Sequence, residues 1–404
     1  MKHSPVSLES AVERLLERIS VPERHETAPL LDALGRIAFK TLEALIDTPP
    51  FDNAPVDGFA LRHTDLTGAS KDSPVALRVV ETFYAGDTPA KALEPGQCAR
   101  VMTGAPIPPG ATCVVRYEDT DNGKDYVKVP FSLKEYQNYR FQGEELRKGR
   151  KLLEKGEYIT VPHIGILAGQ GYTEAAVFTR PKVGILSTGS ELISGNQPLR
   201  PGKIYDSNRY MLGAKVKRLG AEPVFGANAA DDPKVIAETL TELLETCDFI
   251  VTTGGVSVGD QDYMPLVGDL LKAERMFRGI RMKPGGWVTG LYLASKIILC
   301  LSGNPGAAAV SFDLLAGPGI RRLAGAALEG HRRIRCSLEE PFSKPNKSRR
   351  FLYAYLEAGK VSVSSTGVGS GHLASSLGSN CIVDIPAGAA LSAGDTVEAL
   401  LIEP

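Results

Sequence analysis

The sequence predicts a multidomain α/β protein. A central doubly wound α/β domain is expected to join an N-terminal helical and extended region, an inserted small β domain and a C-terminal β-barrel domain. The chain has 404 residues, more than one hydrophobic core usually serves. From Lys182 to about Gly325, short apolar runs alternate with helical stretches, as in a parallel sheet covered by helices. On both sides of that region, short β-rich runs are separated by turns containing proline and glycine.

The N-terminal part begins with an amphipathic helix. Leu8, Ala11 and Leu15 follow helical spacing, and Ser10 with Glu13 has the form of a capping box. The stretch "DTPPFDNAPVDGFAL", with three prolines and a glycine, then breaks the helical pattern. We expect residues 1–50 and 140–180 to form one discontinuous domain, with residues 51–139 inserted as a small β domain.

The second half contains the predicted α/β domain, residues 181–325, and a β domain, residues 326–404. In the α/β domain, the runs at 183–186, 223–225 and 249–251 read as strands, and 208–219 and 234–244 read as helices. The last part returns to short β runs such as "IVDIPAGAALSAGDTVEALLI", which indicate a small closed barrel or sheet.

Composition excludes several classes of function. The formal net charge is -1, so no general basic field exists to hold nucleic acid or a membrane. The six cysteines contain no C-x-x-C spacing, which argues against a zinc site and favours reduced thiols in the core. No apolar run approaches the roughly 18 residues of a membrane span, and the N-terminus lacks an apolar signal segment. A cytoplasmic protein is expected.

Three glycine-containing loops follow apolar strands in the central region. They are "STGSEL" with Thr188, Gly189 and Glu191; "TTGGVSVGDQDY" with Gly254, Gly255 and Asp262; and "LSGNPG" with Ser302, Gly303, Asn304 and Pro305. The second loop alone is equally well read as a tight turn with a solvated acidic end. In a parallel sheet, however, the carboxyl ends of the strands share one edge, where ligands bind. The loop amides would cradle a phosphate.

Three acids are candidates for a metal ion at the same edge: Glu191, Asp231 and Asp262. Carboxylate oxygens are hard ligands suited to Mg²⁺. Asp231 and Asp232 can also be read as helix caps, and one of the two is expected to be one.

Six motifs, in order, resemble one family over nearly the whole length of the chain: "PPFDNAPVDGFAL", "VMTGAPIPPGATCVV", "ILSTGSEL", "IYDSNRYML", "TTGGVSVGDQDY" and "LSGNPG". These resemble the molybdopterin molybdenumtransferases, the MoeA and gephyrin E-domain family. The resemblance implies a four-domain homodimer that inserts molybdate into adenylylated molybdopterin and releases AMP, with Mg²⁺. It also implies possible contact with a molybdopterin adenylyltransferase.

The resemblance adds site residues to those argued from the loops. It implies that Asp57 and Thr103, from the small β domain, complete the cleft against the partner subunit. By their residues alone, Asp57 is better read as a turn acid and Thr103 as a turn hydroxyl. The segment from Asp206 to Asn208 is read equally as a helix cap or as part of the pocket. The complete predicted set for binding substrate is Thr188, Gly189, Asp206, Ser207, Gly254, Gly255, Ser257, Lys283, Ser302, Gly303, Asn304 and Pro305.

One departure from the family concerns the oxyanion. The family commonly follows Lys-Pro-Gly with Lys-Pro, whereas here Gly285 is followed by Gly286 and Trp287. This leaves the preference for molybdate over tungstate open. Two other functions fit the same fold: a molybdopterin adenylyltransferase, which would use ATP, and a non-catalytic scaffold.

Overall fold

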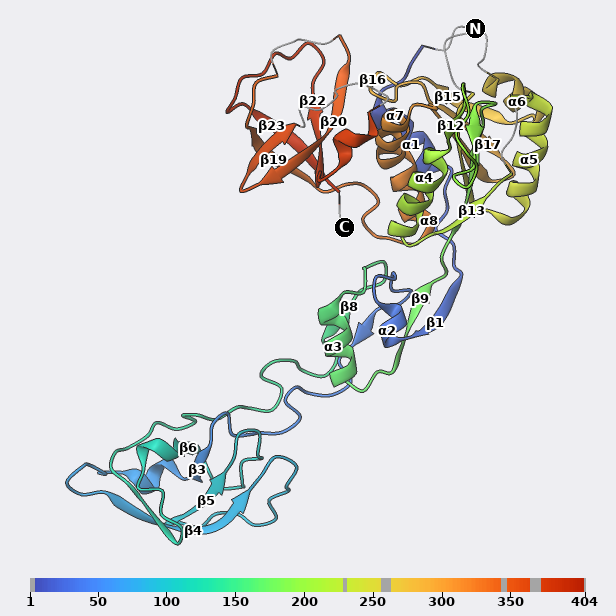
Figure 1. Cartoon of the computed structure of the whole chain (residues 1–404). Coiled ribbons are helices and arrows are strands. Elements are labelled where there is room, and N and C mark those ends of the chain that lie inside the picture. Colours follow the sequence, from blue (N-terminus) through green and yellow to red (C-terminus); the bar gives the residue numbers. More distant parts are fainter. Residues whose placement is uncertain (1–3, 228–230, 256–262, 343–346, 364–371, 403–404) are drawn as a thin grey trace. The chain divides into compact units, whose positions relative to one another are not determined.

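The computed structural model describes residues 4–227, 231–255, 263–342, 347–363 and 372–402 (Figure 1). The chain divides into two compact units. The first contains Met1–Lys40, Lys155–Thr160 and Glu174–Pro404; the second contains Thr41–Glu154 and Val161–Thr173. No helix among the described residues has the length and apolar character needed to cross a membrane.

A six-stranded sheet forms the centre of the first unit, in the order β13-β10-β14-β18-β17-β15. The first four strands in that order are parallel, and β17 and β15 run antiparallel to their neighbours. The strands are β10 (Lys182–Ser187), β13 (Glu222–Phe225), β14 (Phe249–Thr253), β15 (Glu274–Arg278), β17 (Thr289–Leu293) and β18 (Lys296–Leu301). This parallel core carries the loops predicted to bind substrate.

Helices cover both faces of the sheet because successive strand residues point to opposite sides. On one face, Val183 and Phe249 pack with helices α1, α4, α7 and α8. On the other, Ile250 packs with α5 and α6. The helices are α1 (Leu8–Glu17), α4 (Ser207–Arg218), α5 (Pro233–Thr246), α6 (Met264–Leu270), α7 (Pro305–Ser311) and α8 (Gly317–Leu323), and a π-helical turn, η3 (Phe312–Ala316), joins the last two. The predicted doubly wound α/β fold is confirmed.

The C-terminal part of the first unit is a closed barrel. Strands β20, β21, β19, β23 and β22 follow one another, and β22 pairs again with β20. The short strand β16 (Met282–Lys283) of the α/β region extends this sheet by pairing with the start of β20. The barrel elements are β19 (Arg333–Leu338), β20 (Arg349–Glu357), β21 (Lys360–Val363), β22 (Cys381–Ile385) and β23 (Thr396–Leu401), with the turn η4 (Leu373–Ser376). The predicted C-terminal barrel is confirmed.

The first helix is present, but its predicted cap is wrong. The N-cap of α1 is Ser7, whose hydroxyl accepts the Ser10 N–H at 3.1 Å. Ser10 therefore lies inside the helix as the donor partner of the cap. The remaining short elements of the first unit are β1 (His25–Pro29), α2 (Leu30–Ala33), β9 (Glu174–Phe178), β11 (Leu192–Ile193) and β12 (Ile204–Tyr205).

The second unit contains a five-stranded sheet in the order β6-β3-β5-β4-β7. Phe59, Leu61 and Leu77 are completely buried in its core. Its elements are β2 (Leu42–Glu43), β3 (Gly58–Leu61), η1 (His63–Leu66), β4 (Val75–Phe83), β5 (Gln97–Val101), β6 (Cys113–Arg116), η2 (Tyr117–Asp119), β7 (Tyr126–Val129), β8 (Lys151–Leu153) and α3 (Val161–Gly169).

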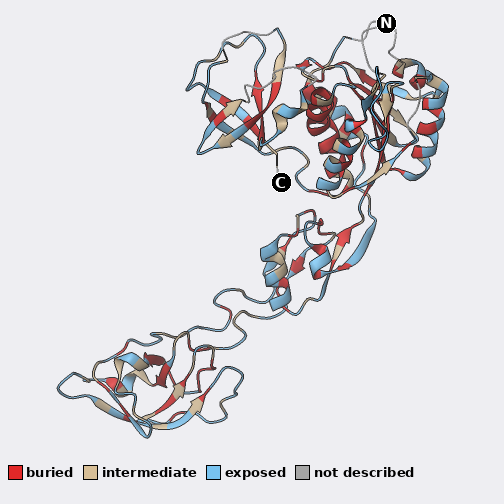
Figure 2. Cartoon of the chain, in the orientation of Figure 1, coloured by how far each residue is buried: buried red, intermediate tan, exposed pale blue. Residues whose placement is uncertain are grey.

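All six cysteines are buried and none forms a disulfide, as the sequence predicts. Burial raises the pKa of Cys98, Cys113 and Cys381 to about 12. Such thiols stay protonated near neutral pH and are poor nucleophiles. Figure 2 shows that the central strands of the sheet are buried, and so are residues 306–311 of α7.

Candidate functional site

The carboxyl ends of three adjacent parallel strands lie at one edge of the central sheet. Hydrogen bonds continue into the loops that follow: Thr188 N–H donates to Thr253 O at 2.9 Å, and Gly254 N–H donates to Leu301 O at 3.2 Å. The structure therefore places the three predicted loops next to one another. Their described residues are Thr188 and Gly189, Gly254 and Gly255, and Ser302, Gly303, Asn304 and Pro305.

Glycine is required for this close approach at one position. Gly254 has a φ of 98°, and a Cβ there would lie 2.2 Å from the carbonyl oxygen of Thr188. Gly303 lies against it, because a Cβ at Gly303 would be 3.4 Å from the Gly254 Cα. A side chain at Gly254 would force the first two loops apart.

Asn208, on the first turn of α4, ties the second and third loops together. Its Nδ2 donates to Thr253 Oγ1 and to Gly303 O, both at 2.8 Å. Thr253 Oγ1 in turn donates to Ser302 O at 3.0 Å. The sequence left Asn208 undecided between a cap and the pocket, and it did not identify Thr253. The motif "IYDSNRYML" was the available signal, but the Asn208 contacts join residues 45 and 95 positions away.

Asp206 is the N-cap of α4, since its Oδ1 accepts the Arg209 N–H at 3.0 Å, and Ser207 is the first residue of the helix. The cap uses only one oxygen of the carboxylate. Among the described residues, Ser187 Oγ and Thr252 Oγ1 on the strand ends are buried without a hydrogen-bond partner. The same holds for three oxygens beyond the strand ends: Thr188 Oγ1, Asp206 Oδ2 and Asn208 Oδ1. Buried polar atoms are normally paired, so these three oxygens mark where a polar ligand or water would bind.

The acids beside this edge have separate positions. Asp231 Oδ2 accepts the Ser190 N–H at 2.9 Å, in the turn that also carries Glu191. The Glu191 carboxylate lies over Gly189, where a Cβ would be 2.7 Å from Glu191 Oε2. Asp232 is instead the N-cap of α5, and its Oδ1 accepts the Lys234 N–H at 2.8 Å. The structure therefore separates a helix cap, Asp232, from an acid at the loop, Asp231.

Ser257 and Asp262 lie outside the described residues. Tyr263, which follows them, donates its N–H to Gly255 O at 3.1 Å. Among the described residues, no three His, Cys, Asp or Glu side chains gather into a group that could hold a metal ion. Glu191 and Asp231 are the described acids that fit the predicted oxygen-ligand set.

Lys283 lies apart from the glycine loops, in a separate cavity of about 1180 Å³. The walls come from the start of α1, the segment around β16 and the barrel. Basic side chains line much of it: Arg281, Lys283, Arg335, Lys347, Arg349 and Arg350. This cavity is therefore a second candidate for binding an anion.

The two arginines at the start of β20 differ within this cavity. Arg349 Nε donates to Asp384 Oδ1 at 2.7 Å, and its Nη1 donates to Glu9 Oε1 at 2.5 Å. Both carboxylates raise the pKa of Arg349, whereas burial lowers the pKa of Arg350. Arg349 is therefore committed to ion pairs that join α1 to the barrel.

Gly286 has no room for a lysine side chain, the residue that the resemblance led us to expect at this place. A Cβ there would lie 2.5 Å from Met282 O and 2.7 Å from Ile280 O. Backbone atoms cannot yield as a side chain can, so Gly286→Lys would distort the loop. Trp287, which is half exposed at 49%, occupies the adjoining position in the cavity wall.

In the second unit, Asp57 and Thr103 are in direct contact. Both the backbone N–H and the hydroxyl of Thr103 donate to Asp57 Oδ1 at 2.7 Å. These two bonds, the backbone bond foremost, lower the pKa of the exposed Asp57, and the charge of Arg100 adds to the effect. The arrangement keeps the carboxylate ionised and holds it through Oδ1.

Replacing Thr103 with valine is expected to raise the pKa of Asp57 only part of the way toward its ordinary value. Valine removes the hydroxyl donor and retains the larger contribution, the backbone N–H. Because the folded-state pKa is lowered, the associated stability is present above the unfolded pKa and is lost as pH falls through the folded value. Carboxyl ¹³C titration of both proteins measures the shift. An unchanged Asp57 titration would contradict the role assigned to the hydroxyl.

Comparisons with known proteins cover the whole chain. Family models for the MoeA N-terminal region (domains I and II), a probable molybdopterin-binding domain and the MoeA C-terminal region (domain IV) match residues 6–171, 184–322 and 335–402. A molybdopterin molybdenumtransferase of Staphylococcus aureus (strain COL) is 36% identical over 409 residues, covering 100% of this chain and 97% of the relative. One from Staphylococcus epidermidis (strain ATCC 12228) is 33% identical over 406 residues, with the same coverage.

A solved structure agrees with these sequence matches. The molybdopterin biosynthesis MoeA protein of Pyrococcus horikoshii OT3 superposes with a TM-score of 0.86 at 30% identity, covering 99% of this chain and 100% of that one. The resemblance inferred from the six motifs is confirmed. The chain belongs to the MoeA family, that of the molybdopterin molybdenumtransferases.

Proposed function

We propose that the protein inserts molybdenum into molybdopterin, using adenylylated molybdopterin and molybdate and releasing AMP. Family membership over the whole chain supports this reaction. The structural observation that carries the proposal is the edge of the α/β sheet, where three loops meet beside buried oxygens without partners. Such an edge suits a large polar ligand that is held by amides and side-chain oxygens.

In this proposal, the chain supplies binding and orientation, and the pterin supplies the sulfur ligands. The amides of Gly255 and Gly303 would face the pyrophosphate, whereas the Gly254 N–H donates to Leu301 O. Thr188, Asp206 and Asn208 would present their unpaired buried oxygens to polar groups of the substrate. No cysteine of the protein is needed, which agrees with six buried thiols.

Mg²⁺ is proposed as the metal ion. Glu191 and Asp231 would hold it, with Asp262 as the third acid of the set predicted from the sequence. The oxygen donors of these side chains fit the preference of Mg²⁺. When bound, the ion would stabilise negative charge that develops on the phosphate.

Molybdate is proposed to approach from the basic cavity. Lys283 belongs to the set of basic side chains that line this cavity, and the Arg349 guanidinium there is paired with Asp384 and Glu9. Asp57 and Thr103 are proposed as the catalytic contribution of the small β domain.

The test is Mg²⁺-dependent release of AMP from adenylylated molybdopterin, with molybdate and with tungstate. Rapid release with molybdate in the presence of Mg²⁺ is expected. Formation of adenylylated pterin from ATP would instead identify an adenylyltransferase. Binding of the pterin without turnover under any metal condition would indicate a scaffold.

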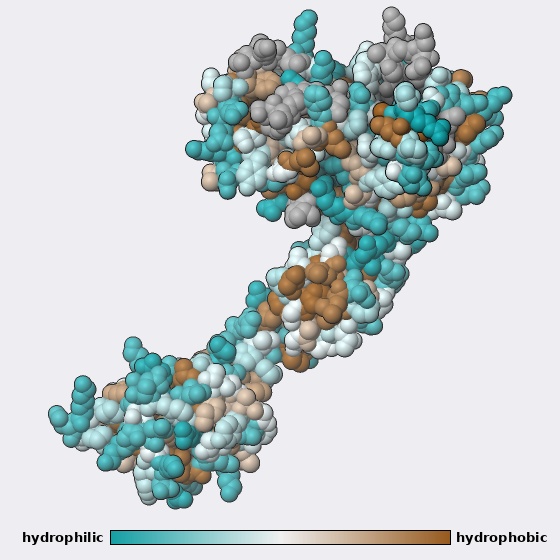
Figure 3. All heavy atoms as spheres, viewed as in Figure 1, coloured by the Kyte–Doolittle hydropathy of each residue, from teal (hydrophilic) through white to brown (hydrophobic). Residues whose placement is uncertain are grey.

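We further propose a cytoplasmic homodimer, which could receive its substrate by contact with a molybdopterin adenylyltransferase. The support for a dimer is helix α3, whose sequence "VPHIGILAG" is almost entirely apolar. Within its own unit it buries Leu167 but leaves Val161 70% and Ile166 38% exposed. Figure 3 shows hydrophobic surface gathered over this helix. A second copy of the chain is the proposed cover, because exposed apolar patches mark contact surfaces.

A charge on α3 is expected to convert the dimer into a monomer. Ile166→Glu would place a carboxylate in an apolar interface, where desolvation disfavours association. Light scattering after size exclusion measures the mass, which should halve. Leu328→Glu, at an exposed leucine outside α3, is the control and should leave the mass unchanged. A dimer that persists in the Ile166→Glu protein would exclude α3 from the interface.

A further inference from the structure

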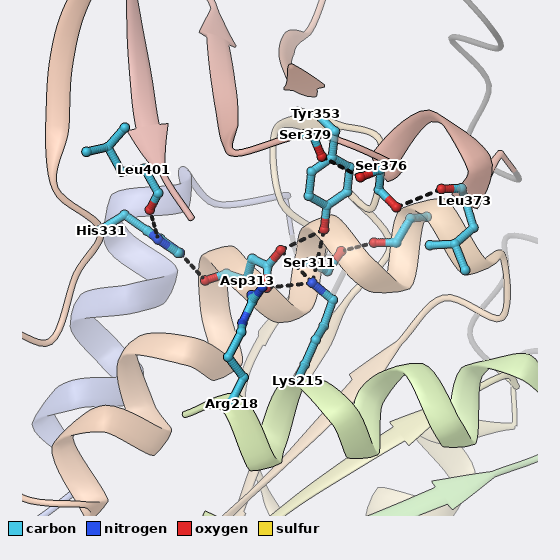
Figure 4. Close-up of polar contacts among 11 residues, drawn as sticks. Lys215, Arg218, Ser311, Asp313, His331, Tyr353, Leu373, Ser376, Ser379 and Leu401 are labelled. Carbon is cyan, nitrogen blue, oxygen red and sulfur yellow. Dashed lines mark hydrogen bonds and ion pairs between the residues drawn. The ribbon is translucent and has the colours of Figure 1, made fainter. Parts of the chain in front are cut away.

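A buried ionic cluster lies between the α/β region and the barrel of the first unit (Figure 4). Its centre is Asp313 of η3, which is only 3% exposed. Lys215 of α4 donates from Nζ to both Asp313 oxygens, at 2.8 and 2.7 Å. Tyr353 of β20 donates from its hydroxyl to Asp313 Oδ2 at 2.6 Å. Arg218 adds a second cation 3.6 Å from Asp313 Oδ1.

Stability alone does not explain this cluster. Removing two charges from water is costly, and well-packed apolar residues often serve the fold equally well. Here burial lowers the pKa of Lys215 and raises that of Tyr353, so both side chains lie in a poorly solvated place. What the polar bonds add is a single defined geometry among the three elements that carry them.

Each of those elements carries proposed substrate-binding groups elsewhere along its length. Helix α4 begins at the Asp206 cap and Asn208. Helix α7, which begins directly after the Ser302–Asn304 loop, runs without a break into η3. Strand β20 starts at Arg349 and pairs with β16, so that Lys283 lies opposite Arg350.

The cluster is also next to the Lys283 loop. Ser311, two residues before Asp313, places its hydroxyl 3.0 Å from Gly285 O. A Cβ at Gly285 would lie 2.0 Å from that hydroxyl oxygen, so the loop and α7 are in close contact. His331 connects the π-helical turn to the barrel. Its Nε2 lies 2.9 Å from the Asp313 carbonyl oxygen, and its Nδ1 lies 3.0 Å from Leu401 O at the end of β23.

We propose that Lys215, Asp313 and Tyr353 form a positioning network for the reaction. By holding α4, η3 and β20 in one arrangement, the network sets the Lys283 cavity in register with the loops at the sheet edge. The inference rests on the proposed function. It assigns these three side chains no contact with the substrate and makes them responsible for the alignment of its two binding regions.

Tyr353→Phe is the first test, because it removes one hydrogen bond and retains the packed ring. We expect the molybdate concentration for half-maximal AMP release to rise about tenfold, since small misplacements of binding groups have large kinetic effects. The Kd for adenylylated molybdopterin should stay within about twofold, because the loop contacts at the sheet edge are intact. Tyr355→Phe, two residues along the same strand and 47% exposed, is the matched control and should behave as the unmodified protein.

A triple variant separates positioning from stability. Lys215→Met, Asp313→Leu and Tyr353→Phe together replace the three hydrogen-bonded side chains with apolar groups. Arg218 stays in place and is 35% exposed, so water can solvate it and the Tm should be preserved. If the network positions the site, this stable protein still shows the raised molybdate requirement. If the triple variant folds and has an unchanged molybdate dependence, the proposal is wrong. Should it fail to fold, Tyr353→Phe alone decides, and a molybdate dependence equal to that of Tyr355→Phe refutes the network.

Hydrogen exchange provides a readout independent of turnover. The peptide spanning residues 280–287 should exchange faster in Tyr353→Phe than in Tyr355→Phe, and equal rates would count against the coupling. If the unmodified protein is folded, as its hydrogen exchange would show, but releases no AMP with molybdate, the proposed function is wrong and the positioning role falls with it. An active unmodified protein with an equally active triple variant would overturn only the positioning role.

Discussion

Asp57→Asn is expected to lower the rate of AMP release by about a hundredfold or more while leaving the fold intact. Asparagine retains an oxygen that can accept both Thr103 donors, so the local turn is preserved. It replaces the second carboxylate oxygen with an amide and removes the charge that Thr103 maintains by lowering the pKa of Asp57. The loss of activity should therefore appear in kcat, with little change in the Tm.

Asp87→Asn is the matched control for this prediction. Asp87 is another exposed acid of the same unit, and its Oδ2 accepts the Tyr84 N–H at 2.7 Å. Neutralising it removes a charge of the same kind from the same small β domain, and AMP release should not change. Equal activity in Asp57→Asn and Asp87→Asn would show that Asp57 is only a turn acid, the alternative that its sequence allows.

The fold could be predicted because buried strands and helices leave recognisable patterns of apolar residues in the sequence. Val183, Phe249 and Ile298 belong to continuous apolar runs, as strands covered on both faces must. The glycine loops followed from those strands, since parallel strands share a carboxyl edge. Gly254 must be glycine because a Cβ there would lie 2.2 Å from the carbonyl oxygen of Thr188. From the sequence, it was only one residue of a glycine-rich loop.

Contacts between distant residues could not be predicted in the same way. Lys215 meets Asp313 from 98 positions away and Tyr353 from 138, and no local pattern pairs them. The choice between two neighbouring residues for one N-cap was equally hard to predict. Ser7 and Ser10 both precede an apolar helical run, and only the extended backbone of Ser7, with a ψ of 161°, identifies it as the cap. Gly286 suggested a missing cation, but the backbone carbonyls of Met282 and Ile280 leave no room for a side chain.

Asp231 and Asp232 show how adjacent, chemically identical residues can have separate roles. The sequence allowed either to be the cap of α5. The structure gives that place to Asp232, which accepts the Lys234 N–H, and turns Asp231 to the Ser190 N–H beside Glu191. The cap at Asp232 contributes to stability, whereas Asp231, as the proposed metal ligand, would contribute to turnover. Substitution at the two positions should therefore affect different measurements.

Asp231→Ala is expected to lower Mg²⁺-dependent AMP release by about a hundredfold, because metal stabilisation of phosphate charge is worth several kcal/mol. Its Tm should barely change, since water can replace Asp231 at the exposed Ser190 N–H. Raising the Mg²⁺ concentration should recover part of the rate, because Glu191 remains. Asp232→Ala should do the reverse: it removes a helix cap, costs about 1 kcal/mol, lowers the Tm by roughly 2–4 °C and leaves AMP release unchanged. The assay is a Mg²⁺ titration of AMP release beside thermal melting for both proteins. If Asp231→Ala lost stability while keeping its Mg²⁺ dependence, the loop acid would be structural and the metal site would have to be built without it.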